Sequence, residues 1–117
     1  MKATVQKQII VPRFTSFAGA GTFATAPLNV RAFSEAYFMF LHVGVLTGTA
    51  DDVYVQESHD LETWTDIGAA LPSFSYTNDE AELRSLRLEW MRLRIVLSGT
   101  DPAMTCWCVA DLIRRES

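Results

Sequence analysis

The fold class is set by residues 90–97, Trp90-Met91-Arg92-Leu93-Arg94-Ile95-Val96-Leu97. Apolar side chains occupy every second position of this stretch and alternate with a set that includes Arg92 and Arg94. A side-chain period of two residues is typical of a β-strand with one buried face. The pattern therefore predicts a strand that turns one apolar row towards a core and its arginines towards the opposite side.

The neighbouring segments have the same β-rich character and are separated by turn residues. Pro12 should end the first strand because proline cannot donate to a strand ladder. Residues 81–88 are compatible with a helical turn because they are rich in good helix formers. Further strands are expected over residues 4–11, 28–33, 36–46, 52–58, 63–67 and 105–113, with turns at Gly48 and at 98–102. A chain of 117 residues has room for one domain, and this spacing predicts an all-β antiparallel sandwich or jelly roll.

Residues 14–26 differ from the rest because they carry no charge and contain Phe14, Phe17 and Phe23. Gly19 and Gly21 should loosen this segment into an extended arm or an irregular edge strand. Phenylalanines are unusual in a solvated linker, so we expect the segment to dock on a surface, either of the same chain or of a neighbouring subunit. The predicted organisation is a strand and extended arm over residues 1–26, followed by a β-sandwich over 27–117.

The strands predicted at 36–46 and 104–113 are apolar on both faces. In the first, Phe38 and Phe40 share one face while Tyr37 and Met39 lie on the other. A strand of an antiparallel sandwich normally shows one face to water, so something must cover the second face. The cover is either the arm or a neighbouring subunit. The candidate interface residues are Phe14, Phe17, Phe23, Tyr37, Met39, Leu41, Trp107 and Val109.

The charge pattern disfavours nucleic acid as a partner. The net charge is −4, and residues 51–81 contain eight acidic residues without a lysine or arginine. Phosphate binding needs clustered basic residues. The start of the chain lacks the apolar core of a signal peptide, and the apolar run at 36–46 is too short for a membrane helix. We therefore expect a soluble protein that is made in the cytoplasm and binds neither membrane nor nucleic acid.

Ser58-His59-Asp60 contains the residue types of a hydrolytic triad, but neighbouring strand residues point to opposite faces. We interpret the segment 58–64, with the pattern S-x-D-x-x-T-W, as a turn in which Ser58 and Asp60 cap backbone amides. Gly19-x-Gly21 resembles a dinucleotide fingerprint, but Pro27 follows too soon for the helix that such a site requires. We expect no catalytic residues and no cofactor.

Cys106 and Cys108 should lie on the same side of one strand, as buried thiols. A zinc site needs about four ligands, and His42 and His59 are the only histidines, so no metal is expected. Oxygen ligands for calcium are an alternative use of Asp51, Asp52, Asp60 and Asp66, beside simple turn formation. Arginines 84, 87, 92 and 94 should pair with the acidic segment, with phosphate contact as the alternative.

Two stretches carry a resemblance to a known family. Gln56-Glu57-Ser58-His59-Asp60 with Trp64-Thr65-Asp66-Ile67-Gly68, followed by residues 91–102, resembles small β-sandwich virion proteins of tailed bacteriophages, of the decoration or head-associated type. The similarity covers residues 53–110, and Leu61 stands where glycine is usual. The resemblance implies a non-enzymatic subunit of the virion, made in the host cytoplasm. Its partners would be copies of itself, as a homo-oligomer, and other virion proteins such as the major capsid protein.

Two alternatives remain open at this stage. The first is a tail or neck position in the same kind of particle. The second is a discoidin-like carbohydrate-binding module, because a similar Ser-x-Asp…Trp hairpin occurs there. In such a module aromatic rings stack on sugar rings, and the candidates are Tyr54, Trp64, Trp90 and Trp107.

Overall fold

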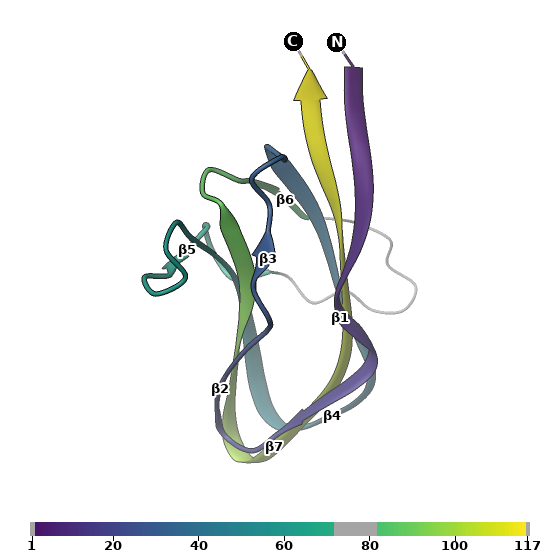
Figure 1. Ribbon diagram of the computed structural model, residues 1–117. Helices are drawn as coiled ribbons and strands as arrows, with labels where there is room; N and C mark the ends of the chain where they lie inside the picture. Colours follow the sequence, from purple (N-terminus) through teal and green to yellow (C-terminus); the bar gives the residue numbers. More distant parts are fainter. Residues whose placement is uncertain (1, 72–81, 117) are drawn as a thin grey trace.

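The computed structural model describes residues 2–71 and 82–116 (Figure 1), with side chains except at 2, 14, 41–51, 115 and 116. These residues form seven strands and no helix. The strands are β1 (Lys2–Ala18), β2 (Gly21–Ala24), β3 (Leu28–Asn29), β4 (Glu35–Ser58), β5 (Thr65–Asp66), β6 (Glu82–Ser85) and β7 (Trp90–Glu116). The all-β antiparallel prediction is confirmed.

The two longest strands, β4 and β7, form the centre of the sheet. They pair antiparallel from Glu35 opposite Ile113 to Ser58 opposite Trp90, with two shifts of register between. β1, β2 and β3 pair with successive segments of the other edge of β7. β5 and β6 pair with the other edge of β4. Residues 2–26 therefore share one sheet with the rest of the chain.

The sheet is folded over on itself, as the bend at the lower end of Figure 1 shows. The pairing of β4 with β7 shifts register between His42 and Leu46 and again between Thr47 and Thr49. We call the side that holds both chain ends the terminal half; it comprises β1, β6 and residues 35–47 and 103–116. The other side, the hairpin half, comprises β2, β3, β5 and residues 49–58 and 90–99.

The turns predicted at Gly48 and at 98–102 are wrong, because β4 and β7 each continue through them. Bulges and register shifts let paired strands bend without ending. Gly99 (φ 112°) and Asp101 (φ 47°) adopt left-handed backbone conformations inside β7, which glycine and aspartate tolerate best. Likewise β1 runs past Pro12, where its pairing with β7 is irregular and the Thr15 hydroxyl donates to the Pro12 carbonyl (2.6 Å).

The helical turn proposed for residues 81–88 is also wrong over the part that the structure describes. Residues 82–85 form β6, which pairs with the start of β4. Arg84 is buried while its neighbours Leu83 and Ser85 are exposed, which is the alternation of a strand. Pairing with an open sheet edge outweighs the intrinsic helix preference of this short segment.

The core lies between the two halves. Phe38, Phe40 and Met104 of the terminal half and Leu93 and Ile95 of the hairpin half are fully buried there. The row predicted from residues 91–97 is thus the inner face of the hairpin half. Cys106 and Cys108 also lie buried on this inner face as free thiols, as predicted. Burial, followed by the nearby Cys106, raises the pKa of Cys108 far above its ordinary value.

Candidate functional site

The outer face of the hairpin half is covered by a polar network. Arg92 Nε donates to Gln56 Oε1 (2.9 Å), and Gln56 Nε2 donates to Asp66 Oδ1 (2.9 Å). Arg94 pairs with the other oxygen of Asp66 (3.1 Å). These bonds join Gln56, Asp66, Arg92 and Arg94 to one another within the chain. The expected pairing of the arginines with the acidic segment is confirmed for Arg94 with Asp66 and for Arg87 with Glu57. Arg92 bonds to the Gln56 amide instead, and Arg84 pairs with Glu82.

Aromatic rings complete this network. The Arg92 guanidinium lies 4.2 Å from the ring centroid of Trp64, and that of Arg94 lies 4.3 Å from the centroid of Tyr54. In the terminal half, Arg13 lies 5.2 Å from the ring centroid of Trp107. Such contacts are cation–π interactions. Three of the four rings considered as platforms for sugars therefore have an arginine over one face.

The outer face of the terminal half has the opposite character. Residues opposite one another in antiparallel strands share a face, and the register gives three apolar cross-strand pairs. Val5 lies opposite Ile113, Ile9 opposite Val109, and Val109 opposite Met39. Together with Tyr37, Leu83 and Trp107 they form what we call the outer apolar face: Val5, Ile9, Tyr37, Met39, Leu83, Trp107, Val109 and Ile113.

Exposure differs within the outer apolar face. Val5, Ile9, Leu83 and Tyr37 are 59%, 58%, 42% and 37% exposed. Val109 is buried, yet it lies outside the core cluster because it points away from the inner face. Polar groups on this face include the ion pair of Lys7 with Asp111 (2.9 Å), the neighbouring Glu35 with Ser85 opposite it, and Arg13 beside Trp107. The outer face of the hairpin half is thus polar and hydrogen-bonded, whereas the outer face of the terminal half is mainly apolar.

The eight residues predicted for the interface divide into three groups. Tyr37, Met39, Trp107 and Val109 lie on the outer apolar face, as the alternation of their strands indicates. The side chains of Phe14 and Leu41 lie outside the described residues.

Phe17 and Phe23 take a different position from the one expected for an interface. They pack on one another (ring centroids 5.3 Å apart) and against the core of the same chain. Their partners across the sheet, Met104 and Ile95, point inward, so both phenylalanines belong to the inner face.

Residues 14–24 prove to be edge strand, the second of the two possibilities left open. β1 and β2 extend the sheet sideways, so neither strand covers the outer face. β1 instead contributes Val5 and Ile9 to that face, and the sequence reading missed both. The alternation Val5-Gln6-Lys7-Gln8-Ile9 was the available signal.

The segment after β4 forms the predicted capped turn. The Ser58 hydroxyl donates to Asp60 Oδ1 (3.0 Å) and accepts from the Leu61 amide (2.9 Å). Asp60 Oδ1 accepts from the amides of Thr63 (2.8 Å) and Glu62 (2.9 Å). Leu61 has φ 67°, which explains why glycine would suit this position. The hydroxyl and carboxylate therefore serve the turn, and His59 is exposed beside it.

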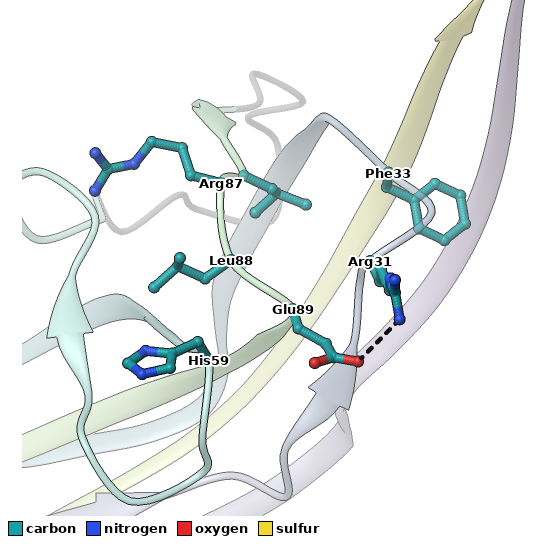
Figure 2. Close-up of a pocket in the computed structure, with 7 residues that line it drawn as sticks. Arg31, Phe33, His59, Arg87, Leu88 and Glu89 are labelled. Atoms are coloured by element: carbon teal, nitrogen blue, oxygen red, sulfur yellow. Dashed lines mark ion pairs between the residues drawn. The ribbon is translucent and has the colours of Figure 1, made fainter.

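A pocket of about 310 Å³ lies between this turn and the segments that follow β3 and precede β7 (Figure 2). Phe33, Leu86 and Leu88 supply apolar surface, and Arg31, His59, Arg87 and Glu89 supply polar groups. Arg31 and Glu89 are 3.9 Å apart, and Arg87 is 2.7 Å from the buried Glu57. The pocket's cations are thus already matched by carboxylates of the chain.

Among the described positions, no three His, Cys, Asp or Glu side chains gather as metal ligands would. The described part of the chain also contains no helix long and apolar enough to span a membrane.

The fold is an antiparallel sandwich of the jelly-roll type, and VP2 of infectious bursal disease virus shares it. The chain superimposes on the infectious bursal disease virus VP2 subviral particle with a TM-score of 0.60 and 12% identity, over 97% of this chain and 33% of that one. The Gt strain of the same virus gives 0.57 and 11% over 97% and 32%, and the Gx strain gives 0.51 and 10% over the same shares. The chain spans about a third of the length of these proteins.

Identities of 10–12% establish a common fold and nothing finer. Models of known protein families give no match, and curated proteins give none either.

Proposed function

We propose that the protein is a structural subunit of a virus particle and that it acts through protein–protein contact, without catalysis. The finer form of the proposal is a decoration or head-associated subunit of a tailed bacteriophage that binds copies of itself and the capsid shell. The jelly-roll fold shared with VP2 supports a structural role in a virus particle. The resemblance of residues 53–110 to virion proteins of tailed bacteriophages supports the assignment to a phage and the decoration role.

The contrast between the two outer faces carries the proposal. In the hairpin half, Gln56, Asp66 and Arg94 are hydrogen-bonded to one another within the chain. The terminal half presents Tyr37, Met39 and other apolar side chains beside the ion pair of Lys7 with Asp111. Removing apolar surface from water contributes about 25 cal/mol per Å², so the outer apolar face gains most from contact with another protein surface.

The mechanism would be reinforcement of a shell. Apolar side chains in flat rows fit the surface of a neighbouring subunit, and each such contact makes dissociation of the shell more costly. The rigid sandwich behind the rows holds them in place because the inner face is fully packed. No bond is made or broken.

Particle incorporation tests the proposal. Purified particles from cells that express the gene are analysed by mass spectrometry, for the native chain and for the double variant Tyr37→Glu/Met39→Glu. We expect the native chain to copurify with particles at a fixed ratio to the shell protein and the variant to be lost from them. Val96→Glu, on the outer face of the hairpin half, is the matched control and should be incorporated like the native chain.

Two outcomes count against the proposal. Absence of the native chain from particles excludes a virion role. Incorporation of the Tyr37→Glu/Met39→Glu variant at the native ratio excludes the outer apolar face as the contact surface. Circular dichroism of both variants establishes that they are folded.

A further inference from the structure

β1 forms one edge of the sheet. Its residues 2–9 pair with β7 on one side. Within the described part of the chain, no strand pairs with their other side. An edge strand presents backbone amides and carbonyls that can pair with another strand. Among the side chains that the structure describes, Val5 and Ile9 on this edge are the two most exposed large apolar ones (59% and 58%).

Residues 3–9 lack the features that usually protect an edge. Natural edges carry proline, bulges or unpaired charges that prevent a second strand from adding. In β1 the irregular pairing and Pro12 come only after Ile9. The single charge between Ala3 and Ile9 is Lys7, and it is neutralised by Asp111 of β7 at 2.9 Å.

The sequence of this edge is close to a palindrome. Val5-Gln6-Lys7-Gln8-Ile9 reads almost the same in both directions around Lys7. In an antiparallel pair of two copies centred on Lys7, Val5 of each copy faces Ile9 of the other, and Gln6 faces Gln8. Both apolar pairs fall on the outer face, beside Ile113 and Val109. Symmetric contacts between identical surfaces of this kind are typical of two-fold dimers.

We propose that the protein forms a homodimer by antiparallel pairing of β1 with β1 of a second copy, centred on Lys7. The sheet of the terminal half then runs continuously through both copies. The two lysines at the centre are each held by their own Asp111, so the four charges cancel. This inference goes beyond the proposed function, because it concerns the sheet edge and requires no particle.

Native mass spectrometry tests the dimer. We expect the native protein at twice the 13.1 kDa chain mass, and the double variant Val5→Lys/Ile9→Lys at the mass of one chain. Both side chains are more than half exposed, so the variant should fold. Leu61→Lys, at an exposed turn of the other half, adds the same kind of charge and should remain dimeric. A monomeric native protein, or a dimeric Val5→Lys/Ile9→Lys variant, overturns the proposal.

Cysteine cross-linking tests the register. Opposite Cα atoms of antiparallel strands are about 4.5–5.5 Å apart, within the range that a disulfide spans. Lys7→Cys should therefore cross-link under mild oxidation. Val5→Cys alone should not, because its two copies are four residues apart along the strand, about 13 Å. An equal mixture of Val5→Cys and Ile9→Cys proteins should cross-link again.

The native cysteines do not interfere with this experiment, because Cys106 and Cys108 are buried. Cross-linking of Val5→Cys alone, or no cross-linking of Lys7→Cys, excludes the pairing centred on Lys7. Failure here would leave the proposed function standing, since particle incorporation is measured with Tyr37 and Met39 variants that leave β1 unchanged.

Discussion

Asp60 is the residue on which the turn after β4 depends. One of its carboxylate oxygens accepts hydrogen bonds from the backbone amides of Thr63 and Glu62 and from the Ser58 hydroxyl. These bonds favour the charged form, in that order, and lower the pKa of Asp60 from 3.8 to about 2. The same turn holds Trp64 close to Arg92, so it links β4 to the polar network of the hairpin half.

The lowered pKa of Asp60 predicts a pH dependence of stability. Because the pKa is lower in the folded state, the stabilisation is fully present above about pH 4 and is lost as the pH falls towards 2. Asp60→Asn should lack this part of the dependence. The free energy of unfolding in urea, measured from pH 5 to pH 2, should converge for the two proteins at low pH. If the free energies of unfolding of the two proteins changed in parallel with pH, Asp60 would not be the source of the pH dependence.

Among the residues that the structure describes, Glu57 is the most deeply buried charged residue, and its side chain is 2% exposed. The Arg87 guanidinium pairs with one of its oxygens (2.7 Å) and the Arg87 amide donates to the other (3.3 Å). A buried carboxylate is tolerated only when it is paired. This pair fixes the segment that leads from β6 into β7.

Removing the Arg87 side chain should destabilise the fold. Arg87→Ala leaves the buried Glu57 carboxylate without its cation, at a cost of about 1–3 kcal/mol. Arg31→Ala is the matched control, because Arg31 is exposed and 3.9 Å from Glu89, and its loss should change stability by under about 0.5 kcal/mol. Urea unfolding at neutral pH measures both. Equal effects of the two substitutions would contradict this role of Glu57.

At the scale of the element, the bend in β4 and β7 decides the architecture. A straight pair of strands would expose the whole inner face, whereas the bent pair closes it on itself. Gly99 lies in β7 at this bend with φ 112°, a conformation in which a Cβ atom is strained.

Gly99→Ala should weaken the bend. A side chain in this backbone region costs about 1–2 kcal/mol, so we expect a loss of that size in the free energy of unfolding. Thr100→Ala, at the next exposed position, should change it by less than about 0.5 kcal/mol. Thermal and urea unfolding measure both variants, and an unchanged Gly99→Ala protein would show that the bend is held elsewhere.

At the scale of the whole molecule, β4 and β7 belong to both halves. Neither half has a core without the other, because Phe38 and Phe40 pack against residues such as Leu93 and Ile95. A molecule built from shared strands is expected to unfold as one cooperative unit.

Tryptophan fluorescence can test this cooperativity. Trp107 reports on the terminal half, whereas Trp64 and Trp90 report on the hairpin half. The variants Trp107→Phe and Trp64→Phe/Trp90→Phe therefore isolate the two signals. Within each variant, the fluorescence midpoint in urea should coincide with the midpoint from circular dichroism. If the fluorescence midpoint of one half lay at a lower urea concentration than the circular dichroism midpoint, the two halves would unfold separately.

The sequence by itself determined the strand character and the side of each strand on which a residue lies. The two-residue period of side chains predicts that alternate residues of Met91–Leu97 point inward and that Cys106 and Cys108 share a face. It also separates Tyr37 and Met39 from Phe38 and Phe40. These are local properties, because the alternation of side chains follows from the backbone of the strand alone.

Only the tertiary structure decided where strands end and what covers them. Gly48 reads as a turn, yet β4 continues through it because β7 stays paired alongside. Phe17 and Phe23 read as docking residues, yet they close the inner face, and Val5 and Ile9 take the outer positions. Pairing partners lie more than a hundred residues apart at the ends of the chain, where Lys2 pairs with Glu116. A register shift between such distant strands leaves no periodic trace in either of them.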